Sequence, residues 1–282
     1  MLNCKLREKT QKKFLKNREE IDRKNERNLW LSRIVAFAYR YQQEARPYKE
    51  LIRDFATFLR LTGGEKVLDI GCGSGRLIKL VLKEMKNPAR EVIGLDNSLS
   101  AINYARKNIK SSKVSFVCSD ISNGLPFLPQ SGFDLIMAGL SIQYAQHWNG
   151  QQWTDQAYIR VIKDIFQVLK PGGWFVFSVN VPNPDFSKVA KKSWREIFFS
   201  RRLFLNLIVA AIMLWQAKWL VKKAAEGRFH YLPIERVTTI LQNVGFTNIS
   251  YKLSYAELAW VIACQKLASN IGDKILSQKK EL

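Results

Sequence analysis

The middle of the chain alternates short apolar runs with segments whose apolar residues recur at helical spacing. The apolar runs predict buried strands at Lys66–Ile70, Glu91–Asp96, Lys113–Cys118, Phe133–Ala138 and Trp174–Val179. The segments around them predict helices at about 48–61, 76–85, 98–109 and 153–169. Strictly alternating strands and helices are typical of an α/β protein, in which a parallel sheet carries helices on both faces.

This alternation stops at residue 181 and returns at residue 233. The interval mixes basic and apolar residues without a strand pattern, whereas a helix is predicted at about 233–243 and strands at about 246–253 and 257–265. We therefore divide the chain into four parts. They are a basic helical extension (1–47), a core (48–180), an insertion (181–232) and the rest of the core with a tail (233–282).

A glycine-rich loop follows the first predicted strand, in the sequence VLDIGCGSG at 67–75. Its glycines, Gly71, Gly73 and Gly75, have the spacing G-x-G-x-G, and Arg76 occupies the third glycine position of the dinucleotide fingerprint G-x-G-x-x-G. This spacing argues against NAD and FAD. Asp69 lies within the same stretch, and its carboxylate suits a ligand that carries an ammonium group better than a pyrophosphate.

Two further carboxylates are expected at the same edge of the sheet. Asp96 ends the second predicted strand and Asp120 follows the third, and ligands of open α/β sheets bind at the carboxyl ends of the strands. Asp96 can accept hydrogen bonds from both hydroxyls of a ribose, and Asp120 can accept one from an adenine amine. A ligand with amino-acid, ribose and adenine parts would satisfy all three acids.

Five segments in order, VLDIGCGSG, VIGLDNS, FVCSDI, FDLIMAGLSIQY and VLKPGGWFVFSV, resemble the successive motifs of class I S-adenosylmethionine-dependent methyltransferases. The resemblance covers about residues 48–180 and 233–265 and is strongest to small-molecule methyltransferases. It implies a Rossmann-like sheet of seven strands, the last of them antiparallel, and S-adenosylmethionine as cofactor. The implied cofactor-binding residues are Asp69, Gly71, Cys72, Gly73, Asp96, Asn97, Asp120, Ile121 and Gly139.

The acceptor of the methyl group is less clearly marked. The residues after the fourth strand, Ala-Gly-Leu-Ser at 138–141, lack the Asn/Asp-Pro-Pro-Tyr/Phe stretch of enzymes that methylate base amines, and there is no Pro-Cys pair for cytosine C5. Gln143 and Tyr144 are predicted to face the acceptor, as is Tyr231 at the exit of the insertion. His147 and His230 are the candidate general bases. The alternative for His147 is an exposed loop histidine beside Trp148, and for His230 a residue that only packs the insertion.

The net charge of +21, from 45 Lys/Arg and 24 Asp/Glu, predicts an anionic partner. The charge is concentrated outside the core: residues 1–28 hold ten basic and five acidic residues, and residues 186–228 hold ten basic residues and two Glu. Within the insertion, 203–215 is apolar except for Asn206. Thirteen residues are too few to span a bilayer, which needs about 20. A lid over the site and an interfacial helix on anionic lipid both remain open for the 203–220 run.

Four scattered cysteines and two histidines provide no clustered metal ligands and no disulfide framework, so we expect no metal and thiols buried as small core residues. The first 28 residues are highly charged and lack the apolar segment of a secretory signal, which predicts a cytoplasmic protein, peripheral to a membrane if the insertion binds lipid. The sequence thus favours methyl transfer to a small or lipid-like acceptor. The alternatives are an RNA methyltransferase and a non-catalytic cofactor-binding module.

Overall fold

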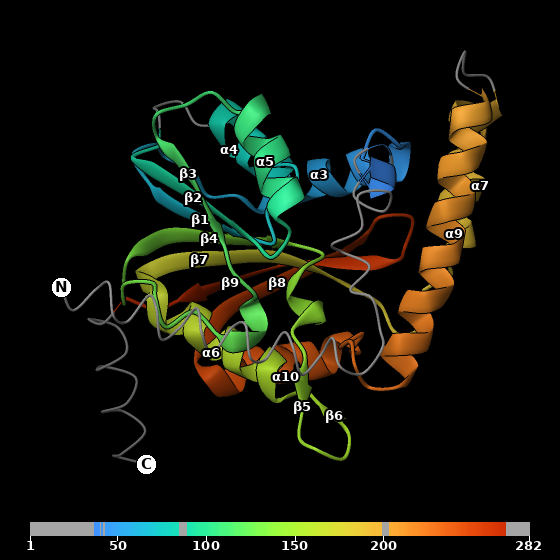
Figure 1. Ribbon diagram of the computed structural model, residues 1–282. Coiled ribbons are helices and arrows are strands. Elements are labelled where there is room, and N and C mark those ends of the chain that lie inside the picture. The colour runs from blue at the N-terminus through green and yellow to red at the C-terminus, as the bar shows by residue number, and fades with distance from the viewer. Residues whose placement is uncertain (1–36, 40, 42, 85–88, 199–202, 269–282) are drawn as a thin grey trace.

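A computed structural model describes residues 37–39, 41, 43–84, 89–198 and 203–268 of this chain (Figure 1). Its centre is a seven-stranded sheet with the strand order β3-β2-β1-β4-β7-β9-β8. Its strands are β1 (Lys66–Ile70), β2 (Glu91–Asp96), β3 (Val114–Cys118), β4 (Phe133–Gly139), β7 (Leu169–Asn180), β8 (Phe246–Ser254) and β9 (Ala259–Lys266). Only β9, the last in sequence, runs antiparallel to its neighbours, so the predicted Rossmann-like fold is confirmed.

Two helical layers cover the sheet (Figure 1). The helices are α3 (Arg46–Phe58), α4 (Arg76–Glu84), α5 (Leu99–Asn108), α6 (Gln156–Val168) and α10 (Ile234–Val244). The first three lie on one face and the last two on the other. Each layer has its own apolar core, one built around α3 and α4 and one around α6 and α10. The central strand β1 is covered from both sides, because Val67, Leu68 and Ile70 are all fully buried between the two helical layers.

The sheet topology brings the carboxyl ends of β1, β2, β3 and β4 to one edge. The parallel register aligns Ile70 with Leu95 and Asp96 with Cys118. Short elements follow two of these strand ends: the 3₁₀ turns η2 (Ile121–Asn123) and η3 (Ile142–Tyr144). A small hairpin of β5 (His147–Trp148) and β6 (Trp153–Thr154), which the hydrophobic pattern does not predict, comes after η3.

Residues 181–232 contain three helices and, in the part that the structure describes, no strand. The helices are α7 (Ser187–Lys192), α8 (Trp194–Phe198) and α9 (Leu203–Ala225). The 23-residue α9 stands along one side of the domain and is ten residues longer than the apolar run that indicates it (Figure 1). By length and composition it could cross a membrane. The expectation of an element too short for that is therefore wrong.

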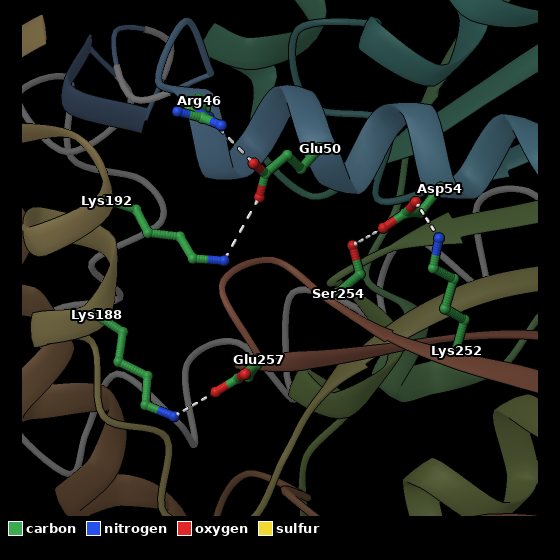
Figure 2. Close-up of polar contacts among 8 residues, drawn as sticks. All are labelled: Arg46, Glu50, Asp54, Lys188, Lys192, Lys252, Ser254 and Glu257. Atoms are coloured by element: carbon green, nitrogen blue, oxygen red, sulfur yellow. Dashed lines mark hydrogen bonds and ion pairs between the residues drawn. The ribbon is translucent and has the colours of Figure 1, made fainter.

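Both ends of the insertion are fixed to the core. At α7, Lys188 pairs with Glu257 (2.8 Å), between β8 and β9, and Lys192 pairs with Glu50 of α3 (3.8 Å) (Figure 2). These are exposed pairs, which contribute little stability individually. After α9, the Arg228 side chain is buried and its Nε donates to Gln146 Oε1 at 2.8 Å.

The cysteines follow their strands. Cys72 and Cys264 are buried free thiols, as expected. Cys118 is exposed, which corrects the expectation for this residue, because β3 is the edge strand of the sheet and its last residue is left uncovered. Cys4 and the basic residues 1–28 lie outside the described residues.

Candidate functional site

A cavity of about 530 Å³ opens at the carboxyl edge of the sheet. Its wall is formed on one side by the ends of β1, β2, β4 and β7. On the other side it is formed by α7, α9 and the residues that precede α3. All nine residues predicted to bind the cofactor lie on this wall: Asp69, Gly71, Cys72, Gly73, Asp96, Asn97, Asp120, Ile121 and Gly139.

The glycine loop is held tightly against the neighbouring strand. The backbone N–H groups of Gly71 and Cys72 both donate to the Leu95 carbonyl, at 2.6 and 2.9 Å. Gly71 has φ = +70°, and a Cβ there would lie 2.3 Å from the Cβ of Ser141. Only glycine fits this position, which lets the loop pack directly against Ser141 after β4.

Asp96 organises the loop from the end of β2. Its Oδ2 accepts from the Gly73 N–H and its Oδ1 from the Ser98 N–H, both at 2.8 Å. Burial raises the pKa of this carboxyl group, and the backbone hydrogen bonds from Ser98 and Gly73 oppose the increase. Each oxygen keeps a lone pair for a further donor, as two ribose hydroxyls would require.

Asp69 is the most unusual group in the cavity wall. Its side chain is buried and neither carboxyl oxygen has a hydrogen-bond partner. Burial, with a smaller contribution from the charge of Asp96, raises its pKa to about 8. A buried carboxyl group without a partner is costly, and a ligand ammonium group would satisfy it. The site thus fits the amino-acid part of S-adenosylmethionine.

The remaining predicted cofactor residues lie on the same cavity wall. Asp120 caps η2, where its Oδ1 accepts from the Ser122 N–H at 2.8 Å. A Cβ at Gly139 would lie 3.0 Å from Leu77 Cδ1, so this position leaves little room for a larger side chain. Among the described residues, no group of three His, Cys, Asp or Glu side chains could hold a metal ion.

The three residues predicted to face the acceptor take different positions. Tyr144 lies on the cavity wall. Tyr231 supports it from behind through a hydroxyl–hydroxyl hydrogen bond of 3.1 Å. Gln143 is fully buried, and its Oε1 accepts from the Asn180 N–H at 2.7 Å. Gln143 and Tyr231 therefore position the wall, and neither lies on it.

The structure brings neither histidine to the cavity. His147 lies in the β5–β6 hairpin, where its Nδ1 is 2.7 Å from the Thr154 hydroxyl. His230 is buried, with its Nε2 3.0 Å from the Ala145 carbonyl. Burial lowers the pKa of His230, so the ring is neutral at pH 7 and its Nε2 donates to that carbonyl. Both rings have structural partners, and the hypothesis of a histidine base at the cavity is not carried further.

His230→Gln should therefore lower the free energy of unfolding without changing the affinity for S-adenosylmethionine. Because the pKa of His230 is lowered by folding, the unfolded chain binds the extra proton, and the native protein loses stability as the pH falls below about 6.5. The variant should show less of this loss in urea titrations at pH 5.5 and 7.5. His147→Ala serves as the comparison, and a raised cofactor dissociation constant in either variant would contradict this placement.

The hydrophobic pattern does not indicate the cavity residues that precede α3. Tyr39, Tyr41 and Gln43 lie on the wall, and Gln43 Oε1 accepts from the Ser74 hydroxyl at 2.6 Å. The Tyr41 hydroxyl donates to Asn206 Oδ1 of α9 at 2.6 Å. The only available signal was the polar–aromatic character of residues 39–43 and the single polar residue in the apolar run of α9.

Three buried polar side chains on the wall, away from the glycine loop, are likewise not indicated by any sequence motif. Gln216 of α9 is fully buried beside the Tyr39 hydroxyl, and neither its Oε1 nor its Nε2 makes a well-aligned hydrogen bond. Ser193 Oγ, between α7 and α8, is also unpartnered, and the Asn180 side chain at the end of β7 contacts the Tyr144 and Tyr231 hydroxyls while its Oδ1 stays without a partner. Buried polar atoms without partners are rare in folded proteins, so this group points to a ligand at the α9 side of the cavity.

Comparison with known proteins identifies the domain. Residues 67–173 match the family model described as a methyltransferase domain. The chain is 26% identical over 182 residues to the biotin biosynthesis bifunctional protein BioHC of Teredinibacter turnerae, with 60% of the chain and 30% of the relative covered. It is 26% identical over 192 residues to a demethylmenaquinone methyltransferase of Lactococcus lactis, with 67% and 68% covered.

Two further similarities agree with this. A sterol 24-C-methyltransferase of Aspergillus fumigatus is 35% identical over 116 residues, which cover 40% of the chain and 27% of that protein. The chain thus spans less than a third of two of these relatives. An S-adenosylmethionine-dependent methyltransferase structure from Mesorhizobium loti has a TM-score of 0.54 at 18% identity, with 79% of the chain and 99% of that structure covered.

Proposed function

We propose that this chain, which belongs to the class I S-adenosylmethionine-dependent methyltransferases, transfers the methyl group to an uncharged, lipid-like acceptor. The observation that carries the proposal is the amide of Gln216, which is fully buried in the cavity wall beside the Tyr39 hydroxyl and makes no well-aligned hydrogen bond. Around this amide the wall is mostly apolar, and its apolar members on α7 and α9 are Val189, Ala190, Val209, Ala210, Met213, Leu214, Ala217 and Leu220. An apolar site with a few polar groups binds a largely apolar ligand and orients its polar end.

The charges on the wall favour an acceptor without an anionic group. Among the described residues of the wall, the basic side chain is Arg76, and it pairs with Glu44. The acids Asp69, Asp96 and Asp120 lie at the cofactor end. A phosphate or carboxylate acceptor would enter this cavity without a cation to balance its charge, which is costly in a buried site. Amides and phenols, by contrast, pair well with a hydroxyl or carbonyl group.

The chain's own residues then supply position and exclusion of water. S-Adenosylmethionine, when bound, supplies an electrophilic methyl group on a sulfonium. The amide of Gln216 and the hydroxyl of Tyr144 orient the acceptor, and α9 covers it. Such positioning can contribute roughly 7–11 kcal/mol of barrier lowering. The tyrosine hydroxyl is protonated at neutral pH, because burial raises the pKa of Tyr144 above its ordinary value.

The relatives named for a demethylated menaquinone and for a sterol act on molecules of this kind. An acceptor with a large apolar body partitions into membranes. We therefore place the reaction at a membrane surface, with the enzyme as a peripheral protein that collects the acceptor there.

Methyl transfer is tested with labelled S-adenosylmethionine and a fractionated cell extract. We expect the label in the neutral-lipid fraction, and Gln216→Leu should lower kcat/KM for that fraction about tenfold, because one hydrogen bond to a buried acceptor is lost. The dissociation constant of the cofactor should not change. Gln242→Leu, at an exposed glutamine of α10, is the matched control. Label recovered in RNA, or in anionic metabolites, would refute the proposal.

A further inference from the structure

The helix α9 presents apolar side chains to solvent as well as to the cavity. Its outer face consists of Phe204 (82% exposed), Leu207, Ile208 (58%) and Trp215 (57%). Trp194 and Phe198 of α8, which packs against α9, extend this surface and are about half exposed. Contiguous apolar groups of this size on a protein surface mark a contact with a partner or a membrane.

A role as a lid does not explain this outer face. A helix that covers a cavity needs one apolar face. In α9 this face includes Val209, Ala217 and Leu220, which are buried on the cavity side. The opposite face of an ordinary surface helix is polar. Here it carries Phe204 and Ile208 instead, so the helix is apolar on both sides.

Basic residues border the outer face of α9. Lys218 and Lys222 are exposed at its C-terminal end, and Arg195 is exposed on α8, which packs against α9. The sequences of α7 and α9 contain no Asp or Glu. Apolar side chains bordered by lysine and arginine match the boundary between the headgroups and acyl chains of an anionic membrane.

The contacts between α9 and the rest of the domain favour a helix that lies on a membrane over one that crosses it. Although the helix is long and apolar enough to cross, its inner side is buried against the domain. That side includes Asn206, which accepts from Tyr41 in the segment before α3, and the buried Gln216 and Leu220. Lipid cannot surround a helix held in this way, so only the outer face is available to it.

We propose that the outer face of α9 docks on an anionic membrane surface, where α9 lies parallel to the bilayer. The exposed apolar and basic residues indicate this docking whatever reaction the protein catalyses. Docking would deliver the acceptor to the cavity on the other side of α9, and this purpose rests on the proposed function. A second copy of the chain is a poorer occupant. A two-fold contact places the same patch on both subunits and would bring the lysines of one copy near those of the other.

The test is co-sedimentation of the full chain with vesicles of phosphatidylcholine alone and of phosphatidylcholine with phosphatidylglycerol. We expect binding to the anionic vesicles that weakens with added NaCl, and little binding to the neutral ones. The triple variant Phe204→Gln/Ile208→Gln/Trp215→Gln should bind at least about 100-fold more weakly, because its inserted apolar area is lost. Lys218→Glu/Lys222→Glu should bind about 30-fold more weakly or worse, as about 1 kcal/mol per lysine implies.

Matched controls separate this surface from general effects. Leu99→Gln/Phe127→Gln/Tyr251→Gln removes three exposed apolar side chains elsewhere, and Lys79→Glu/Lys83→Glu reverses two exposed lysines on α4. Both should bind vesicles like the unaltered chain. Cofactor affinity, and methyl transfer to an acceptor dispersed in detergent, should survive in the α9 variants, so that failure of docking is distinguishable from failure of the reaction.

Three results would overturn the proposal. The first is absence of vesicle binding by the unaltered chain. The second is vesicle binding that persists in the triple variant, which would move the contact elsewhere, for example to the basic residues 1–28. The third is a dimer in analytical ultracentrifugation that the triple variant abolishes, because a second copy would then occupy the outer face of α9.

Discussion

Asp69→Asn is expected to stabilise the cofactor-free protein at pH 8 and, in the same variant, to weaken S-adenosylmethionine binding about 100-fold. Both effects have one cause, the buried carboxyl group that has no hydrogen-bond partner. Folding removes this group from water and gives nothing in return until a ligand cation arrives. The amide keeps the shape of the side chain and removes the charge. Losing one member of a buried charge pair costs roughly 2–5 kcal/mol of binding.

The pH dependence of this stabilisation has a definite sign. The ordinary pKa of an aspartate is 3.8, and the pKa of Asp69 in the folded protein is about 8. Between these values the folded state holds a proton that the unfolded chain has released, so the stability of the native protein falls as the pH rises, by up to about 1.4 kcal/mol per pH unit. Asp69→Asn lacks this loss. Its advantage should be absent near pH 4 and greatest at and above pH 8.

Cofactor affinity should show the complementary dependence. Below pH 8 the unliganded Asp69 is mostly protonated, and pairing with an ammonium group requires release of that proton. Affinity of the unaltered chain should therefore fall about tenfold per pH unit from pH 7.5 to 6, where a ligand α-amino group stays mostly protonated. The affinity of Asp69→Asn should be flat over this range.

Urea titrations of the cofactor-free proteins at pH 4, 6 and 8, together with calorimetric titration of the cofactor at pH 6 and 7.5, measure these quantities. A variant that is less stable than the unaltered chain at pH 8, or one whose cofactor affinity keeps the pH slope, would refute the assignment of the ammonium group to Asp69.

The strands could be predicted from sequence because their burial is a local property of the chain. In β1, the three apolar residues Val67, Leu68 and Ile70 are all buried, and a short buried run of this kind differs in its pattern from an amphipathic helix. The strand predicted at Trp174–Val179 is shorter than β7, which extends from Leu169 to Asn180. The start of β7 contains Pro171 and two glycines, which are residues typical of a turn. The hairpin of β5 and β6 has two residues per strand and leaves no periodic signal.

The cofactor side of the cavity was predictable for a related reason. A parallel sheet brings consecutive strand ends together, so Asp69, Asp96 and Asp120 could be placed at one edge from sequence order alone. The acceptor side is made by contacts between distant segments, such as the Tyr41–Asn206 hydrogen bond across 165 positions. The apolar run of α9 indicated burial, but hydrophobic periodicity could not assign its two faces, because both are apolar.

Asp96→Ala is expected to raise the dissociation constant of S-adenosylmethionine by about 100- to 1,000-fold while the protein still folds. The carboxylate holds the Gly73 and Ser98 N–H groups at 2.8 Å and is proposed to accept from the ribose as well. Hydrogen bonds to a charged group contribute roughly 1.5–3 kcal/mol each, so two lost ribose contacts account for most of this range. Asp96→Ala leaves the Gly73 and Ser98 N–H groups without an acceptor, which destabilises the folded protein. The variant also removes the cost of burying a carboxylate, which offsets part of this destabilisation, so the protein should still fold.

The two roles of Asp96, holding the loop and binding the ribose, can be separated by changing the ligand. For the unaltered chain, a cofactor analogue with a 2′-deoxyribose should bind at least about tenfold more weakly than S-adenosylmethionine. For Asp96→Ala the two ligands should bind equally, because the group that distinguishes them is gone. Asp134→Ala, at the opposite end of β4, where the carboxylate accepts from the Lys66 N–H at 2.8 Å, controls for loss of a structural acid. If Asp96→Ala still discriminates between the two ligands in calorimetric titrations, the carboxylate shapes the loop and does not bind the ribose.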